Sequence, residues 1–546
     1  MEDFLPAAVA EELRGGRGRA RASARLDLPL HAKPGLAGSV NYQKLLALPS
    51  HDPKVRAECE YQLGWMLDVT RYKNVVRRSA RQVPVARMTR EHVAKMLEVG
   101  HVIEVDEYFV RGGVKMFTVV EEEKERLRAI KHTEDANNVL PSSEPGHEVR
   151  MATKTTIVGL VHGGTHMAAL DLASWFDQLP YAEEVSQLFC FQHEGKFYAL
   201  PVASMGSRVS VSVASAVTWQ LLNFERRSKR CEVVIDNVVF VGSEEDVEHD
   251  VLEFRRRCKE VGAVLNDVNV PVKEIVVQRG EWCGVHLDLV AKTTQLTPKL
   301  VSRTKLSMGL RAQWTWRGFA ACVGLLFYSN GIIDCAMHRR FSLLSFVSRV
   351  SANLTEFPEL WDEKCSIWPS AMRDIEEWAA LVIENKPREV PTAHAAPEWI
   401  VATDASRWGW GYLAVKSNGE VRAHGERWSA QMERLFGDRL GASTFAEPHG
   451  VVNAMCHLIA PRDGVKRVRI ATDNTATECS FNRGFSSHAL HLNACIGRLQ
   501  DTYVGTRFEL VHIAGVLNPA DPYSRGVSQT AAERMAGAER LRQVVG

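Results

Sequence analysis

The fold of the C-terminal part of the chain is decided by the segment Thr403-Asp404-Ala405-Ser406-Arg407-Trp408-Gly409-Trp410-Gly411-Tyr412. It continues an apolar run that begins at Trp399, and it predicts a strand, an aspartate, and a glycine-bearing turn into a second strand. A carboxylate at the end of a strand can act as a hard oxygen ligand for a divalent cation. The segment therefore predicts an α/β domain with an acidic site at Asp404.

Three more acidic residues follow at positions that suit the same site. They are Glu447, just before an apolar helical run, Asp473, just after the strand Val468-Arg469-Ile470-Ala471, and Asp521, in Asn518-Pro519-Ala520-Asp521-Pro522. With Asp404 they are expected on a first strand, a first helix, a fourth strand and a last helix. Four such carboxylates can hold two Mg²⁺ ions and activate a water for phosphodiester cleavage. The alternative is four unrelated surface carboxylates.

These motifs resemble the ribonuclease H family as found in retroelements. The resemblance implies that Asp404, Glu447, Asp473 and Asp521 are catalytic and bind metal. The stretch from His512-Ile513-Ala514-Gly515 to Ser524-Arg525 is similar to the retrotransposon form of the last motif. The resemblance gives His512 a role in product release, and an ordinary surface or core histidine is the alternative.

Two other aspartates stand upstream where apolar runs meet loops. Asp171 follows Met167-Ala168-Ala169-Leu170, and Asp236 lies between Val233-Val234-Ile235 and Val238-Val239-Phe240-Val241. The second pattern predicts a hairpin with acidic residues at its tip. Two carboxylates can hold a pair of metal ions ~3.5–4 Å apart for phosphoryl transfer, although solvated turn aspartates are the more common case.

The order of the flanking segments over about residues 90–300 resembles the reverse-transcriptase family. Asp171-Leu172-Ala173-Ser174-Trp175-Phe176-Asp177-Gln178 looks like the first palm motif. The resemblance implies that Phe176 packs under the sugar and excludes a 2′-hydroxyl, and it takes Gln178 as a substrate-binding residue. Ile235-Asp236-Asn237-Val238 stands where the family has its second acidic motif.

Further motifs of the same family lie on either side of these two. Lys124 to Ile130 resembles the fingers motif, with Arg128 and then Lys124 as triphosphate contacts. Phe197 to Pro201, followed by Met205-Gly206-Ser207-Arg208, is similar to the template-gripping strand and helix. Glu281-Trp282-Cys283-Gly284-Val285 resembles the primer grip. The resemblance therefore adds the substrate-binding candidates Lys124, Arg128, Met205, Gly206, Arg208, Trp282 and Gly284.

The chain departs from the family pattern at Asn237, where the family has a second aspartate, and at Val234, where it has an aromatic residue. An amide oxygen is a weaker cation ligand than a carboxylate. Polymerisation is expected to be slower, to prefer Mn²⁺, or to be lost. Two alternatives stay open: a ribonuclease H with a degenerate, hybrid-binding polymerase domain, and an inactive domesticated nucleic-acid-binding scaffold.

The predicted fold class is α+β and α/β multidomain. A right-hand polymerase of fingers, palm and thumb precedes a ribonuclease H-like mixed sheet with flanking helices. Four domains are expected. Residues 1–85 form an N-terminal extension, and residues 86–300 form the fingers and palm. Residues 301–393 form a mainly helical thumb and connection, and residues 394–546 form the ribonuclease H-like domain. A helix is expected from Thr89 to Gly100, and the Pro-rich stretch 384–397 is the best linker.

The composition is that of a globular protein, with 45% hydrophobic and 24% charged residues and a net charge of +1 over 546 residues. The basic tract from Arg14 to Arg25 either binds phosphate, acts as a nuclear address, or is a solvated tail. The eleven cysteines include no Cys-x-x-Cys pair, which favours a reducing compartment. No membrane span or secretory signal is recognised, so an intracellular location, cytoplasmic or nuclear, is expected.

The resemblance also implies partners and cofactors. They are Mg²⁺ or Mn²⁺, two per active site, an RNA template, a DNA primer, RNA/DNA hybrid and dNTPs. Among retroelements, Thr472-Asp473-Asn474-Thr475-Ala476 and Phe481-Asn482-Arg483-Gly484 are most similar to the DIRS group and to the VIPER elements, which use a tyrosine recombinase. Element-encoded nucleic-acid-binding and recombinase proteins are therefore further candidate partners.

Overall fold

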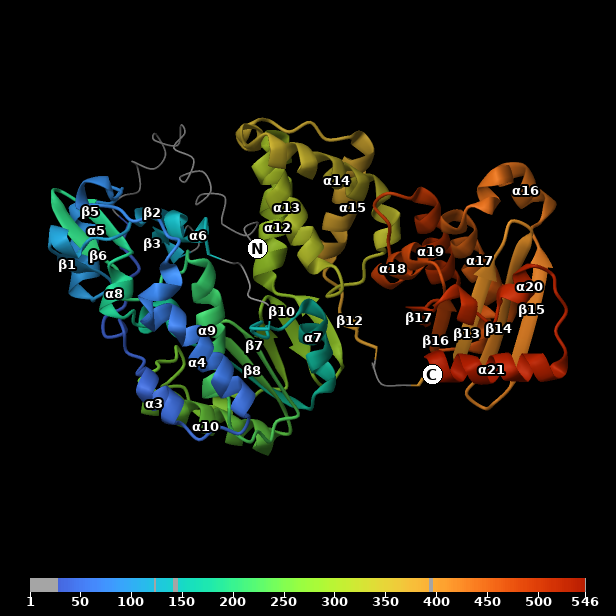
Figure 1. Ribbon diagram of the computed structural model, residues 1–546, viewed down its shortest axis with the longest axis horizontal. Helices are drawn as coiled ribbons and strands as arrows, with labels where there is room; N and C mark the ends of the chain where they lie inside the picture. The colour runs from blue at the N-terminus through green and yellow to red at the C-terminus, as the bar shows by residue number, and fades with distance from the viewer. Residues whose placement is uncertain (1–27, 122–123, 141–145, 392–395, 546) are drawn as a thin grey trace. The chain divides into compact units, whose positions relative to one another are not determined.

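The computed structural model describes residues 28–121, 124–140, 146–391 and 396–545. The chain forms two compact units: unit 1 is Met1–Leu300 with Pro387–Val390, and unit 2 is Val301–Lys386 with Pro391–Gly546. Both units mix helices and sheets, as predicted (Figure 1). The basic tract from Arg14 to Arg25 lies outside the described residues.

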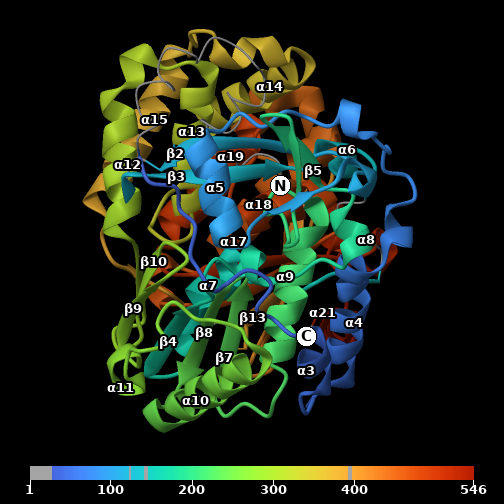
Figure 2. The ribbon, with the colours of Figure 1, turned by 90° about the vertical axis from the view of Figure 1, so that its left-hand side faces the viewer.

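The centre of unit 1 is a three-stranded antiparallel sheet with the order β4–β8–β7. Its strands are β4 (His166–Asp171), β7 (Arg230–Val234) and β8 (Asn237–Gly242). Residues 238–241 of β8 are completely buried, as expected for a run of β-branched and aromatic side chains. Helices α9 (Arg208–Leu221) and α10 (Glu244–Val261) pack against this sheet, and α4 (Pro53–Leu67) packs against α9 (Figure 2).

A second group of strands in unit 1 forms a hairpin and a small sheet. β2 (Lys115–Glu121) pairs with β3 (Arg126–His132), and the sheet β1–β6–β5 contains Ile103–Val105, Lys196–Ala199 and Cys190–His193. Helix α5 (Arg90–Glu98) lies where its pattern predicted. The Thr89 side chain accepts a hydrogen bond from the His92 backbone at 3.3 Å, and Gly100, at φ +77°, follows the helix.

A four-stranded sheet with the order β12–β11–β10–β9 completes unit 1. It contains β9 (Arg279–Trp282), β10 (Val285–Asp288), β11 (Thr293–Leu296) and β12 (Arg388–Glu389). β12 comes from the stretch predicted as a linker, and Glu389 pairs with Thr293. That part of the linker prediction is wrong because an extended polar segment can supply the backbone groups that the open edge of a sheet needs.

The first part of unit 2, where a mainly helical thumb and connection is predicted, contains α-helices, the first of which begins in unit 1. They are α12 (Pro298–Gly309), α13 (Trp316–Ser329), α14 (Phe341–Glu356) and α15 (Pro369–Glu384). The predicted apolar residues Trp314 and Leu326 are buried. Trp378 of α15 is also buried, and its indole N–H donates to the Ser329 hydroxyl of α13 at 3.1 Å. Buried aromatic packing therefore joins α13 to α15.

The rest of unit 2 is built on a five-stranded mixed sheet with the order β15–β14–β13–β16–β17. β13 pairs antiparallel with β14 and parallel with β16, and β16 pairs parallel with β17. The strands are β13 (Trp399–Ala405), β14 (Gly409–Lys416), β15 (Val421–Arg427), β16 (Arg467–Thr472) and β17 (Arg507–His512). The sequence predicted a mixed sheet with flanking helices here, and the structure has one.

Two hydrophobic clusters cover this sheet. One joins the strands to α17 (Ser443–Leu458) and α19 (Leu490–Thr502), and the other joins them to α21 (Ala531–Val545). β13 is buried along almost its whole length, as expected for a strand at the middle of a covered sheet. The backbone of β13 is thus well fixed, and its end can hold a side chain precisely.

Short helices connect these elements. They are α3 (Tyr42–Ala47), α6 (Glu134–Asn137), α7 (Lys154–Gly159), α8 (Glu183–Ser186), α11 (Val272–Ile275), α16 (Ala430–Phe436), α18 (Thr475–Arg483) and α20 (Asp521–Ser524). The eleven cysteines all lie among the described residues, and no disulfide joins any of them. None of the helices formed by described residues is both long and apolar enough to cross a bilayer.

Candidate active sites

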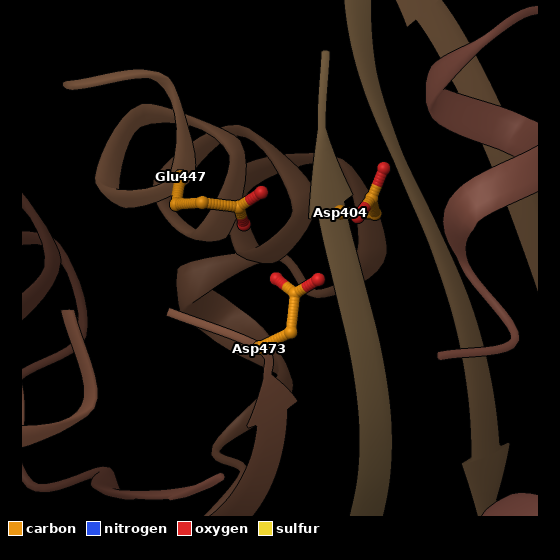
Figure 3. Close-up of side chains that lie close together, drawn as sticks. All are labelled: Asp404, Glu447 and Asp473. Atoms are coloured by element: carbon orange, nitrogen blue, oxygen red, sulfur yellow. The ribbon is translucent and has the colours of Figure 1, made fainter. Parts of the chain in front are cut away.

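Three of the four predicted carboxylates of unit 2 come together at one edge of the mixed sheet (Figure 3). Asp404 lies near the end of β13, Asp473 directly follows β16, and Glu447 reaches toward both from α17. β13 and β16 are parallel neighbours, so their carboxyl ends lie at the same edge. The parallel pairing therefore brings Asp404 and Asp473 together, although their strands lie far apart in the sequence. Thr403 and Ala471, for example, are 68 residues apart.

The three carboxylates are close enough to share a cation. One oxygen of each lies within 4.8 Å of the other two, and Asp404 and Glu447 are buried. Glu447 Oε1 accepts a hydrogen bond from the Ala405 backbone at 2.9 Å, whereas Oε2 is buried without a partner among the described residues. Buried carboxylate oxygens are normally paired. The unpaired oxygen and its neighbours therefore fit a hard divalent cation such as Mg²⁺.

The pKa values of these carboxyl groups are raised by burial and by the charges of their neighbours. Burial, together with the charges of Asp404 and Asp473, raises the pKa of Glu447 to about 9. Burial also raises the pKa of Asp404 to about 6, while the Ser524 hydroxyl opposes this rise by donating a hydrogen bond to the carboxylate. Binding of a cation would favour the ionised forms.

The fourth predicted carboxylate, Asp521, is not in the close group. Its side chain is 42% exposed and forms an ion pair with Arg525, at 2.7 Å between Oδ1 and a guanidinium nitrogen. Its charge nevertheless raises the pKa of Asp404. Asp521 begins the one-turn helix α20, so the expected place on the last helix is wrong. Pro522 is the second residue of this turn, and Gly526, at φ +71°, separates it from α21.

Three neighbours of the carboxylates had no role in the sequence prediction. The Asn518 amide donates to the Thr403 carbonyl at 2.9 Å and to Asp404 Oδ1 at 3.4 Å, and the Ser524 hydroxyl donates to Asp404. A Cβ at Gly515 would lie 2.9 Å from Asp473 Oδ2. The recognised motif contained all three, but only the fold shows which carboxylate each one touches.

His512 lies at the end of β17, opposite Thr472 of β16. Its side chain is exposed, in contrast with the neighbouring Ile513, which is buried. This position is near the carboxyl edge where Asp473 follows Thr472. The predicted role of His512 in product release stays a prediction.

In unit 1, Asp171 and Asp236 lie on neighbouring segments of the central sheet. Asp171 is the last residue of β4 and stands opposite Asn237, and Asp236 is in the two-residue turn between β7 and β8. Ile235, the other turn residue, has φ +58°, which is strained for a β-branched side chain. The Thr218 hydroxyl donates to the Ile235 carbonyl at 2.8 Å and holds this turn from α9.

Amide side chains occupy part of the hydrogen-bonding capacity of both aspartates. Asn237 donates to Asp236 Oδ1 at 3.0 Å, and Asn266 donates to Asp171 Oδ2. Burial raises the pKa of Asp171 to about 6, with a further contribution from the charge of Asp236, and burial also raises the pKa of Asp236. The pair can hold a cation with two carboxylates and the Asn237 amide oxygen, which gives less negative charge than the cluster in unit 2.

The predicted triphosphate contacts lie on or beside strand β3. Arg128 is partly exposed, its guanidinium is 3.5 Å from Glu121, and its charge lowers the pKa of Asp236. Its charge thus acts on Asp236. Lys124 is exposed just before β3 begins at Arg126. The structure places Arg128 toward the site and gives no such indication for Lys124.

Phe176 and Gln178 lie in the 3₁₀ turn Trp175–Gln178. Phe176 is 8% exposed and belongs to the core of unit 1. Gln178 is fully buried; it donates to the Val264 carbonyl at 3.0 Å and accepts from the Val264 N–H at 2.8 Å. Its amide also contacts the Ala173 carbonyl and the Ser39 hydroxyl. This bonding favours a structural role for Gln178 rather than the predicted contact with substrate.

Met205, Gly206 and Arg208 lead into helix α9. Met205 is 50% exposed, while the Gly206 carbonyl accepts a hydrogen bond from Asn137 Nδ2 at 2.7 Å. The Arg208 N–H donates to Asn137 Oδ1 at 2.9 Å. Asn137, which no sequence motif marks, therefore fixes the backbone of this predicted template-gripping segment.

Trp282 is the last residue of β9, and Gly284 lies in the turn of the β9–β10 hairpin. Cys283, at φ +48°, and Gly284, at φ +78°, form this two-residue turn, as a type I′ hairpin requires. Burial, followed by the charges of Asp236 and Asp171, raises the pKa of Cys283 to about 12, so the turn lies near both aspartates. Trp282 is 2% exposed. The predicted primer grip is therefore beside the acidic pair.

No protein-family model and no curated protein matches the chain. Three solved structures of foamy viral protease-reverse transcriptase are similar. The dRH form with double-stranded DNA is 11% identical, covering 86% of this chain and 81% of that chain, with a TM-score of 0.43. The complex with RNA/DNA hybrid is 13% identical and covers 90% of this chain and 64% of that chain, with a TM-score of 0.43. A complex with double-stranded DNA is 13% identical and covers 88% of this chain and 99% of that chain, with a TM-score of 0.42. Because the sequence identities and TM-scores are this low, the proposed function rests on the geometry of this chain alone.

Proposed function

We propose that unit 2 is a ribonuclease H that cleaves the RNA strand of RNA/DNA hybrids. One observation carries the proposal: Asp404, Glu447 and Asp473 lie within 4.8 Å of one another. They do so at the carboxyl edge of a β15–β14–β13–β16–β17 sheet. The resemblance to ribonuclease H assigns metal binding to the same three residues.

In this proposal the three carboxylates hold two Mg²⁺ ions, with Asp521 as a further ligand after it leaves Arg525. Bound Mg²⁺ would supply activation of a water and neutralisation of charge on the phosphoryl group. Asn518 and Ser524 orient Asp404, and Ala405 orients Glu447. Recognition depends on the backbone and the 2′-hydroxyl, because cleavage has no need of a base sequence.

We further propose that unit 1 is an RNA-directed DNA polymerase. Asp171 and Asp236 would hold the metal ions, and Arg128 would contact the triphosphate. The primer 3′-hydroxyl attacks the α-phosphate of a dNTP, a new P–O bond forms, and pyrophosphate leaves. The acidic pair beside the strained turn at Ile235 favours this function over a hybrid-binding domain without activity. Asn237 favours slow synthesis or a preference for Mn²⁺.

Two substitutions in the full chain test these functions separately. Asp473→Asn should abolish Mg²⁺-dependent cleavage of a labelled RNA/DNA hybrid and spare primer extension. Asp236→Ala should abolish primer extension and spare cleavage. Asp438→Asn is the control, because its side chain is 99% exposed.

Three results would contradict the proposal. Cleavage that persists in Asp473→Asn would mean that the nuclease site is misassigned. Wild-type protein that extends no primer with Mg²⁺ or Mn²⁺ would leave a ribonuclease H with a degenerate polymerase. Absence of both activities would favour the domesticated scaffold.

The biological setting belongs to the same proposal. We infer a retrotransposon reverse transcriptase of the DIRS/VIPER kind, acting in the cytoplasm or nucleus on an RNA template, a DNA primer and dNTPs. Element-encoded nucleic-acid-binding and recombinase proteins would be its partners. The genomic neighbourhood tests this: a tyrosine-recombinase reading frame beside this one agrees with it, and an integrase frame contradicts it.

A further inference from the structure

The segment that precedes α3 crosses the acidic pair of unit 1. We call residues 28–40 the strap; Figure 2 shows it as the dark-blue coil that leads down to α3. Near its start, the His31 N–H donates to the Leu127 carbonyl of β3 at 2.7 Å. Near its end, the Val40 N–H donates to the Gln178 carbonyl at 3.0 Å. The strap is therefore attached to both the β2–β3 hairpin and the turn after β4.

The end of the strap is also fixed by close packing. Leu36 and Val40 are buried, and the Asn41 N–H donates to the Val261 carbonyl at 2.8 Å. A Cβ at Gly262 would lie 2.2 Å from the Ser39 carbonyl oxygen, and Gly262 has φ +83°. Glycine is thus required where the strap passes α10. These contacts hold the middle of the strap over the palm.

Lys33 stands in the middle of the strap, beside Asp171. Its ammonium donates to Asn266 Oδ1 at 2.8 Å, across 233 residues of sequence, and Asn266 in turn donates to the Asp171 carboxylate. The Asn266 N–H also donates to the Asp171 carbonyl at 2.9 Å, so the Asn266 side chain is held in place. An ammonium has three donors, and this hydrogen bond uses one.

The position of Lys33 complements that of Arg128. Arg128 follows Leu127, the residue of β3 to which the strap is attached. Arg128 therefore lies on β3 next to the point where the strap is attached, and Lys33 lies on the strap, linked through Asn266 to Asp171. Phosphoryl transfer sites depend on such cationic groups, because charge on the triphosphate must be balanced where it is transferred.

We propose that Lys33 binds the phosphates of the incoming nucleotide from the palm side. This inference rests on the polymerase function proposed for unit 1. A charge-assisted hydrogen bond from an ammonium to a phosphate oxygen is among the stronger hydrogen bonds in proteins. No local motif marks Lys33, because its place beside Asp171 arises from the path of the strap. Lys33 is accordingly a nucleotide-binding residue and no metal ligand.

The test compares Lys33→Gln, Lys33→Arg and the wild type as full chains. Two quantities are measured: KM for dTTP in extension of oligo(dT) on poly(rA), and equilibrium binding of dTTP with Mg²⁺ by calorimetry. Lys33→Gln should weaken both by about tenfold, the loss of one charge-assisted hydrogen bond. Lys33→Arg should stay within about threefold of wild type because it keeps the charge. Lys44→Gln, on exposed α3, should change neither.

Further readouts separate phosphate binding from a merely structural role. Hybrid cleavage, melting temperature and affinity for primer–template should be the same in all variants. If Lys33→Gln leaves dTTP affinity and KM unchanged while the wild type extends primers, the inference fails and the polymerase proposal stands. If Lys33→Arg is as weak as Lys33→Gln, or primer–template affinity falls equally, Lys33 is structural and the inference fails. If wild type neither binds dTTP nor extends primers, both fail together.

Discussion

Replacing Glu447 by glutamine should change the stability of the protein in opposite directions with and without metal. Without metal, Glu447 is a buried carboxyl group with one unpaired oxygen and two acidic neighbours. Its pKa is raised from 4.5 to about 9 by burial and by the charges of Asp404 and Asp473. Glutamine is almost isosteric and carries no charge, so it removes the cost of ionisation.

The magnitude follows from proton linkage. Between about pH 4.5 and 9 the folded state holds a proton on Glu447 that the unfolded chain has released. The free energy of unfolding contributed by this group is therefore fully present below pH 4.5 and is lost as pH rises toward 9, by about 1.4 kcal/mol per pH unit. From pH 5.5 to pH 8.5 the metal-free wild type should lose roughly 2–4 kcal/mol that Glu447→Gln retains.

The assay is calorimetric unfolding of the full chain in EDTA at both pH values, repeated with Mg²⁺. In EDTA at pH 8.5 the Glu447→Gln variant should be the more stable protein. In Mg²⁺ it should be the less stable one and should not cleave hybrid, since it has lost an anionic ligand. Glu433→Gln, on the exposed face of α16, is the matched control. The reasoning is refuted if wild type and Glu447→Gln show the same pH dependence in EDTA, or if Mg²⁺ stabilises both equally.

Three other substitutions give direct predictions. Asn237→Asp should increase primer extension in Mg²⁺ about tenfold or more, because a carboxylate replaces a neutral ligand; an equal or lower rate would contradict the assigned position. Gly515→Ala should weaken hybrid cleavage about tenfold, since its Cβ would lie 2.9 Å from Asp473 Oδ2; circular dichroism should show an unchanged fold, and full activity would refute the contact. Gln178→Leu should lower the free energy of unfolding by about 2–4 kcal/mol, because it leaves the backbone partners of the buried amide unpaired; an unchanged melting temperature would favour the original substrate-binding prediction.

Local features of the chain could be predicted from the sequence because short-range physics sets them. Helix α5 begins after its Thr89 cap and ends before Gly100, and the pattern around Asp236 forms the expected hairpin. Asp404 and Asp473 stand at strand ends because apolar runs precede them. Alternation, capping and turn residues act over a few positions, so they can be read from neighbours along the chain.

The composition of the acidic site in unit 2 could be predicted only in part. Asp404, Glu447 and Asp473 meet as expected, whereas Asp521 is turned toward Arg525, four residues later in the chain. Whether Asp521 pairs with Arg525 or joins the acidic cluster depends on distances in the fold, which the spacing of residues along the sequence does not give. Gln178 shows the same limit, since its amide is bound by backbone from a different part of the fold.

Residue types and local patterns along the chain indicate which residues can do chemistry and the kind of element that carries each of them. Which of these residues meet depends on the fold: β13 lies beside β16, β12 joins a sheet in unit 1, and Lys33 reaches Asn266 across 233 residues. The reason is that burial and backbone pairing are satisfied over the whole fold, so contacts between distant residues are collective. The motif around Asp404 could therefore be recognised in the sequence, but the meeting of the three carboxylates depends on how the strands pair in the sheet.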